Sequence, residues 1–184
     1  MIQIRVHGRG GQGVVTAAEL IAIAAFHAGR QAQAFPHFGV ERSGAPIKSY
    51  ARIADEPILT RERVYAPDIL IIQDHTLLGE AEISEGIKKD TLIIINAPRN
   101  FQSPMRLNSK NIHYTPATDI ALEIIGKNLV NTVILGALAK KTDLINLESL
   151  KEAIKEKFKE KGEGIINKNI KAITRAYQET LWKN

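Results

Sequence analysis

Two short, uninterrupted apolar runs limit the folds open to this chain more than any other feature of its sequence. Residues 68–73 have the sequence DILIIQ and residues 91–96 have the sequence TLIIIN, and prolines and aspartates bound both runs. A strand with one wet face alternates apolar and polar residues, whereas a continuous apolar run is typical of a strand buried on both faces of a parallel sheet. The sequence therefore predicts an α/β fold, a three-layer α/β/α domain with a mostly parallel, Rossmann-like sheet.

The remaining elements follow from hydrophobic periodicity and from turn residues. Further strands are predicted over Ile2–Val6, Gln31–Phe35, Ile47–Ile53 and Ile112–Pro116. Helices are predicted over Val14–Ala28, Leu77–Ile87, Ala117–Gly126, Asn131–Lys140, Leu147–Phe158 and Ile166–Trp182, which makes the C-terminal third helical. Because the chain has 184 residues and no linker or internal repeat, we expect a single domain over residues 1–184.

Composition excludes several classes of protein. The chain has no cysteine, so it cannot form disulfides, bind zinc through thiolates or ligate an iron–sulfur cluster through cysteine sulfur. Its longest apolar run, Ala17–Phe26, is interrupted by Glu19 and is shorter than the roughly 20 residues that span a bilayer. The formal net charge is +5, but the lysines of Lys151–Lys161 alternate with glutamates, which is typical of a solvated helix face. We therefore expect a cytoplasmic protein that binds neither membrane nor nucleic acid.

A glycine-rich segment follows the first predicted strand and precedes the first predicted helix. Its candidate binding residues are Gly8, Gly10, Gly11, Gln12 and Gly13. The spacing satisfies GxGxxG in the strand-to-helix position where backbone N–H groups approach a phosphate. A dinucleotide fold also requires an acid about 20 residues on, at the end of the second strand, and a P-loop requires Gly-Lys-Ser/Thr. Neither is present, which leaves two alternatives: the glycines allow a tight turn and close packing, or they contact an anion or a partner.

The helix predicted after this loop is unusually apolar. From Val14 to Ala28 its only charged residue is Glu19. A helix that is hydrophobic all round must be buried all round. In a small domain this favours burial in a subunit interface.

The second predicted loop has equally unusual chemistry. It lies in the stretch FPHFGVERSGAPIKSYARI, and its candidate site residues are Arg42, Ser43 and Gly44. Arg42 offers a planar set of five donors suited to a carboxylate or a phosphate, and the nearby glycines and prolines can hold the loop in one shape. An ordered surface loop without a ligand is the alternative.

Other polar residues near predicted strand ends are assigned structural roles. They are the histidines His7, His37 and His75 and the aspartates Asp68, Asp74 and Asp119. No serine, cysteine or carboxylate partner stands at a recognisable spacing from any of the histidines, and aspartates commonly cap helices. We therefore predict no catalytic residue and no metal site in this chain.

The order of these motifs resembles a known family. The sequence GxGGQG…TAAELIA…AFPHFGVERSGAP…ARI is similar to the γ subunit of pyruvate and related 2-oxoacid:ferredoxin oxidoreductases, and to the matching domain of the single-chain enzymes. The later segments NTVILGALAK and LESLKEAIKEKF resemble the same family, so the similarity covers nearly the whole chain. The family's second loop often contains Arg-Gly-Gly or Arg-Arg-Gly-Ala, whereas this chain has Arg42-Ser43-Gly44-Ala45, which leaves the individual member open.

The resemblance implies a complex in which a 2-oxoacid reacts with coenzyme A and oxidised ferredoxin to give acyl-CoA, CO₂ and reduced ferredoxin. Pyruvate is the expected 2-oxoacid. It implies that thiamine diphosphate, Mg²⁺ and [4Fe–4S] clusters lie in partner α, β and δ subunits. This γ chain would bind none of them alone and would be inactive in isolation. Its glycine loop and the residues Arg42–Gly44 would face the other subunits or coenzyme A. The alternative is a free-standing nucleotide- or CoA-binding protein of doubly wound fold.

Overall fold

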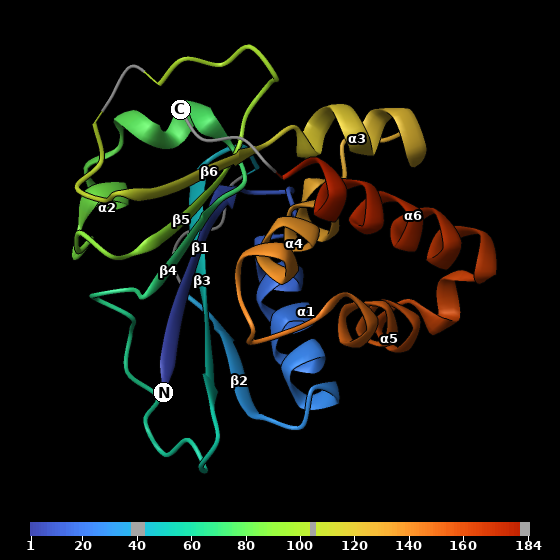
Figure 1. Cartoon of the computed structure of the whole chain (residues 1–184), viewed down its shortest axis with the longest axis horizontal. Helices are drawn as coiled ribbons and strands as arrows, with labels where there is room; N and C mark the ends of the chain where they lie inside the picture. Colours follow the sequence, from blue (N-terminus) through green and yellow to red (C-terminus); the bar gives the residue numbers. More distant parts are fainter. Residues whose placement is uncertain (38–42, 104–105, 181–184) are drawn as a thin grey trace.

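A six-stranded sheet forms the centre of the molecule (Figure 1). The computed structural model describes residues 1–37, 43–103 and 106–180. In chain order the strands are β1 (Ile2–Arg9), β2 (Gln31–Pro36), β3 (Pro46–Ala54), β4 (Ile69–Ile72), β5 (Leu92–Asn96) and β6 (Asn111–Thr115). Their order across the sheet is β2-β3-β1-β4-β5-β6. Every residue of β4 and β5 is buried, as the continuous apolar runs predicted.

One strand runs against the others. Strands β1, β4, β5 and β6 pair in parallel, and β3 pairs antiparallel with both β1 and β2. A parallel neighbour of β2 would need a crossover connection of a dozen or more residues. Only residues 37–45 join β2 to β3, so β3 returns in the opposite direction between β2 and β1. The mostly parallel sheet predicted from the sequence is thus a mixed sheet with one reversed strand.

Long helices cover one face of the sheet (Figure 1). They are α1 (Val14–His27), α3 (Ala117–Ile124), α4 (Val130–Lys141), α5 (Leu147–Lys157) and α6 (Glu163–Glu179). Helix α4 lies deepest, with every residue from Val130 to Ala139 buried. Gly136 permits this because a methyl group there would lie 2.2 Å from the Ile173 carbonyl oxygen of α6. No helix in the described ranges has the length and apolar character needed to cross a membrane.

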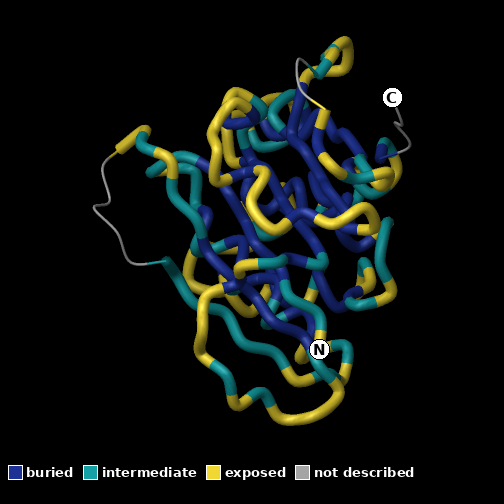
Figure 2. Tube along the Cα trace, turned by 90° about the vertical axis from the view of Figure 1, so that its left-hand side faces the viewer, coloured by how far each residue is buried: buried dark blue, intermediate teal, exposed yellow. Residues whose placement is uncertain are grey.

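The opposite face is covered by a thinner layer. The helix predicted over Leu77–Ile87 is instead a 3₁₀ turn, η1 (His75–Gly79), followed by the one-turn helix α2 (Ala81–Ser84). The extended backbone of Glu80 ends the first, and Gly86, with φ +67°, follows the second. Together with nearby loops these short helices bury Leu70 and Ile72 of β4. Figure 2 shows that buried segments run through the inside of the molecule and that most exposed segments lie at its periphery.

One face of helix α1 is buried by its own chain. It packs between the sheet and the helices α4 and α5. Its single acid, Glu19, lies 2.8 Å from Lys157 Nζ of α5, and His27 Nε2 lies 2.9 Å from Glu156 Oε2. The C-terminal helices thus supply much of the cover that the sequence pattern left unassigned, whereas Phe26 is 72% exposed, so the subunit interface stays a prediction. The last predicted helix begins at Glu163 rather than Ile166, and Trp182 lies outside the described residues.

Candidate functional site

The glycine loop connects β1 to α1 through two left-handed backbone positions. Gly11 has φ +93° and Gly13 has φ +70°. A methyl group on Gly8 would lie 2.6 Å from Val14 Cγ2, and one on Gly13 would lie 2.5 Å from Asn131 Nδ2 of α4. Close packing therefore accounts for Gly8 and Gly13. Gly11 has open space around it and is exposed, which leaves it free for an outside contact.

Side chains of the loop close on an acid from the next parallel strand. Asp74 directly follows the buried Gln73 at the end of β4, and its Oδ2 lies 3.2 Å from Arg9 Nε and accepts from Gln12 Nε2 at 3.1 Å. Gln12 Oε1 accepts from the Arg9 N–H at 2.8 Å. Arg9 also donates to Thr76 Oγ1 at 2.8 Å. These contacts fix the loop to the start of η1.

The charge of Asp74 is stabilised in this setting. Burial alone would raise the pKa of Asp74, but hydrogen bonds from Thr76 and Gln12 and the charge of Arg9 outweigh it and hold the pKa below its ordinary value. Arg9 is therefore paired with an acid of its own chain, which weakens the case for a simple phosphate site.

The two loops that the sequence singled out lie against each other. Gly10 N–H donates to the Ala45 carbonyl at 2.8 Å, and Gly44 N–H donates to the Gly10 carbonyl at 3.0 Å. Arg9 Nη1 adds a hydrogen bond to the Gly44 carbonyl at 3.2 Å. Ser43 and Gly44 are exposed, and Gly44 has φ +81°. Arg42, which the sequence placed at the centre of the second loop, lies outside the described residues.

The histidines and aspartates near strand ends lie in different local environments. His7 is buried; burial, helped by the charges of Arg5 and Lys48, lowers its pKa to about 3, so it is neutral at pH 7. His75 packs its ring edge-on against Phe101, with 4.9 Å between ring centroids. Asp68 Oδ2 accepts from the Gln3 N–H at 2.8 Å. Asp119 Oδ2 lies 3.6 Å from Arg99 Nη1. Among the described residues, no three His, Asp or Glu side chains form a group that could hold a metal ion.

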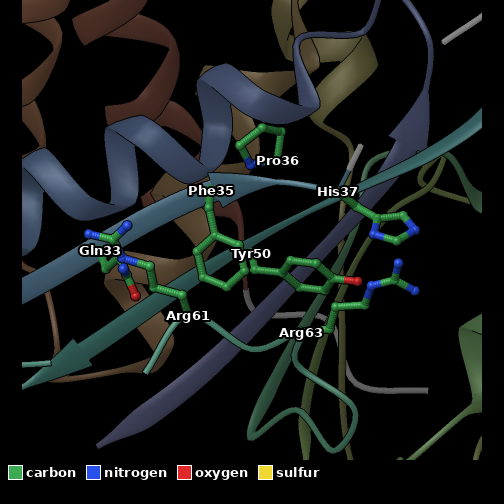
Figure 3. A pocket seen from close by; sticks show the side chains of 7 residues that line it. All are labelled: Gln33, Phe35, Pro36, His37, Tyr50, Arg61 and Arg63. Carbon is green, nitrogen blue, oxygen red and sulfur yellow. The ribbon is translucent and has the colours of Figure 1, made fainter. Parts of the chain in front are cut away.

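A cavity of about 440 Å³, which was not predicted from the sequence, lies on the sheet face opposite α1. Its lining residues are Gln33, Phe35, Pro36, His37, Tyr50, Arg61 and Arg63 (Figure 3). The Phe35 and Tyr50 rings lie 5.2 Å apart between centroids. Burial lowers the pKa of His37, and the neighbouring charges of Lys48 and Arg63 lower it further. The alternation in QAQAFPH was a usable signal, because it places residues 33, 35 and 37 on one face of a strand. Nothing in the sequence marks Arg61 and Arg63.

Comparison with known proteins decides the family. Residues 3–179 match the family described as Pyruvate ferredoxin/flavodoxin oxidoreductase. The chain belongs to this family. It is 44% identical over 184 residues to the "Pyruvate/ketoisovalerate oxidoreductases common subunit gamma" of Thermococcus kodakarensis, with 98% of each chain covered. It is 50% identical over 156 residues to the "Pyruvate synthase subunit PorC" of Methanosarcina barkeri, covering 84% of this chain and 85% of that one.

A solved member of the family has the same architecture. The pyruvate oxidoreductase subunit PORC of Thermotoga maritima superposes with a TM-score of 0.83 at 38% identity, covering 97% of this chain and 96% of that chain. The α/β fold and the family resemblance predicted from the sequence are confirmed.

Proposed function

We propose that this chain is the γ subunit of a 2-oxoacid:ferredoxin oxidoreductase complex that acts on pyruvate. The observation that carries the proposal is the 44% identity to a γ subunit of pyruvate and ketoisovalerate oxidoreductases, which extends over 98% of both chains. The reaction consumes the 2-oxoacid, coenzyme A and oxidised ferredoxin and releases acyl-CoA, CO₂ and reduced ferredoxin. A free-standing nucleotide-binding protein is not favoured, because the similarity to an oxidoreductase subunit extends over 98% of both chains.

The redox and thiamine chemistry belongs to the partner subunits in this proposal. Iron–sulfur clusters are held by cysteine thiolates, and this chain has no cysteine. Its described residues offer no group of three acids or histidines for the Mg²⁺ of thiamine diphosphate. The residues present therefore fit neither an iron–sulfur cluster nor the Mg²⁺ of thiamine diphosphate. We place thiamine diphosphate, Mg²⁺ and the [4Fe–4S] clusters in the α, β and δ subunits.

The paired loops are the proposed contact surface toward those subunits or coenzyme A. Gly11, Ser43 and Gly44 are exposed, and the backbone hydrogen bonds between Gly10 and residues 44–45 hold the two loops in one arrangement. Glycine leaves room for another backbone or a phosphate to approach closely. Arg42, which precedes Ser43, completes this surface in the proposal.

The choice of 2-oxoacid is proposed to reside elsewhere in the complex. The name of the Thermococcus kodakarensis relative describes one γ subunit common to pyruvate and ketoisovalerate oxidoreductases. A subunit shared by two enzymes cannot by itself separate their substrates. By the same logic, the pocket that selects the 2-oxoacid in this complex lies in the other chains.

Native purification tests the proposal. The chain is tagged and purified from its own cells without oxygen, and the co-purifying proteins are identified. The material is then assayed for CoA-dependent ferredoxin reduction with pyruvate and with branched 2-oxoacids. We expect co-purification with a thiamine-diphosphate subunit and a cysteine-rich subunit, activity with pyruvate, and no activity of the isolated chain. Turnover by the isolated chain, or its tight binding of NAD without any partner, contradicts the proposal.

A further inference from the structure

The outer edge of β2 is unusually open for the edge of a sheet. Strand β2 ends the sheet order, and its sequence QAQAFP contains no charge. Exposed edge strands pair readily with other chains, and proteins normally protect them with charged residues, bulges or a covering segment. Pro36, at the end of the strand, is the one residue of β2 that blunts this edge, and the uncharged residues before it are suited to receive a further strand.

The register shows which backbone groups face outward. The His37 N–H donates to the Lys48 carbonyl at 3.1 Å, which makes this a hydrogen-bonded pair of the β2–β3 ladder. Hydrogen-bonded pairs alternate in antiparallel sheets, so Gln33 and Phe35 also bond to β3. Ala32 and Ala34 then direct their N–H and C=O groups away from β3. No other described residue pairs with these outward groups.

Pro36 agrees with this register. It belongs to the outward-facing set, and a proline in a sheet is tolerated where its missing N–H faces away from the ladder. Its carbonyl extends the row of outward acceptors formed by Ala32 and Ala34. The open edge therefore presents outward carbonyls at Ala32, Ala34 and Pro36 and outward N–H groups at Ala32 and Ala34.

The cavity described above adjoins this edge and gives it a charge preference. Gln33 and Phe35 of β2 line it, and Arg61 and Arg63 reach it from the connection between β3 and β4 (Figure 3). The described lining residues include no acid. The Arg52 guanidinium also lies over the Phe35 ring, 4.8 Å from its centroid. The cavity thus has an aromatic floor and a cationic rim.

We propose that the β2 edge binds an extended, acidic segment of another subunit of the complex as a seventh strand. Its backbone pairs with Ala32 and Ala34, one apolar side chain covers the Phe35 and Tyr50 rings, and its carboxylates meet Arg61 and Arg63. This inference rests on the proposed function, which supplies the partner subunits. A second copy of this chain is a poorer occupant, because pairing β2 with β2 would bring two cationic cavities together.

Hydrogen exchange at single-residue resolution tests the edge directly. The isolated chain is compared with the purified complex. We expect the Ala32 and Ala34 amides to exchange fast in the isolated chain and at least about 100-fold more slowly in the complex, since buried strand bonds open only with larger unfolding. The amide of His37, already bonded to Lys48, serves as the internal reference and is protected in both. Equal exchange of Ala32 and Ala34 in both samples overturns the inference.

Substitutions test the same edge by assembly. Ala34→Pro removes an outward N–H without removing a bond to β3, and Arg61→Glu with Arg63→Glu reverses the charge of the exposed rim. Lys89→Glu, an exposed reversal in the connection from α2 to β5, is the matched control. We expect the edge and rim variants to keep the parental melting temperature, while the yield of purified complex falls at least about tenfold. The proline removes a backbone donor to the added strand, and the reversed charges repel the acidic segment. The control assembles normally.

The remaining outcomes are also decisive. If the variants assemble at parental yield in an active complex, this inference fails while the proposed function stands. If no partner co-purifies with the parental chain, both fail. If sedimentation shows a dimer of the isolated chain whose Ala32 and Ala34 amides are protected, the occupant is a second copy. Protection of these amides by inorganic phosphate or free coenzyme A alone would assign the cavity to a small anion instead.

Discussion

Arg9 and Asp74 join the glycine loop to the segment after β4 through a contact of 3.2 Å between Nε and Oδ2. The two residues are 65 positions apart in sequence; Arg9 ends β1, and Asp74 follows β4, the parallel neighbour of β1. The same guanidinium reaches Thr76 Oγ1 and the Gly44 carbonyl. One side chain therefore links three segments of the proposed contact surface.

Arg9→Lys should weaken this arrangement without unfolding the chain. Lysine keeps the charge but loses the planar set of donors that reaches Asp74, Thr76 and Gly44 together. We expect a loss of about 1–2 kcal/mol in unfolding free energy, the usual worth of partly exposed hydrogen bonds to a charged group. The turnover rate of the reconstituted complex should fall by more than this loss of unfolding free energy alone would cause. Denaturant unfolding of the isolated chain measures the first effect, and turnover of the reconstituted complex measures the second. If the variant complex turns over at the parental rate, the contacts of Arg9 that position the loop do not matter for function.

Asp74→Asn should make the loop less stable at neutral pH but not in acid. The folded pKa of Asp74 is lowered, so its contribution to stability is fully present above its unfolded pKa and is lost as pH falls through the folded value. We expect the parent to exceed the variant by about 1–2 kcal/mol at pH 7. The difference should shrink below about pH 4, the ordinary range of an aspartate. Urea titrations of both proteins at several pH values check this, and a constant difference would contradict it.

His7 should contribute an acid sensitivity of its own. Its folded pKa is lowered to about 3 by burial, while the unfolded chain takes up the proton near the ordinary value of 6.5. Between these values the unfolded state binds more protons, so stability falls on acidification by up to about 1.4 kcal/mol per pH unit. The neutral variant His7→Gln removes this dependence. Between pH 6.5 and 4.5 the unfolding free energy of the variant should decrease less than that of the parent. If the unfolding free energies of both proteins change equally with pH, His7 is protonated in the folded chain.

The strands and long helices were predictable because their signals are local. The runs at residues 69–72 and 92–96 are buried strands, as their continuous apolar sequence indicated. The direction of β3 and the breakdown of the helix expected over Leu77–Ile87 were not predicted. The short connection between β2 and β3 was visible in the sequence, but its consequence for the direction of β3 was not drawn. The broken helix depends on tertiary context, because Arg5 of β1 donates to the carbonyls of Glu82, Ile83 and Glu85 around the one-turn helix α2.

The candidate site was predictable only in part. The spacing of glycines located the first loop, and an unusual local composition located Ser43 and Gly44. Sequence spacing could not show that the two loops bond to each other, because that pairing depends on β3 lying beside β1. The cavity over Phe35 was missed for the same reason, since Arg61 and Arg63 approach it only in the folded chain.

Arg42→Lys should lower the activity of the reconstituted complex while leaving the unfolding free energy of this chain nearly unchanged. The substitution keeps the charge and loses the bidentate geometry that suits a carboxylate or a phosphate. If Arg42 forms only an exposed ion pair, worth about 0–1 kcal/mol, even Arg42→Ala should have little effect. Turnover, the apparent affinity for coenzyme A and subunit association are measured for both variants. Parental values for Arg42→Ala would remove the functional role proposed for this loop.

Gly13→Ala and Gly11→Ala separate packing from backbone freedom within one loop. Both positions have positive φ, so each alanine carries a conformational cost of about 1–2 kcal/mol. At Gly13 the new methyl group also meets Asn131 Nδ2 at 2.5 Å, which should add about 1–3 kcal/mol of overpacking. At Gly11 nothing lies within 4 Å, so the conformational cost stands alone.

The packing part of this cost can be relieved from the other side of the contact. In the double variant Gly13→Ala with Asn131→Ala, the amide that collides with the new methyl group is gone, and only Asn131 Cβ, 3.3 Å away, remains. The double variant should therefore lose less stability than the two single variants added together, and a double-mutant cycle by urea unfolding measures the difference. Additive losses would show that the clash at Asn131 is absorbed by movement of α1. In that case the need for glycine at position 13 would rest on its left-handed backbone alone, as it does at Gly11.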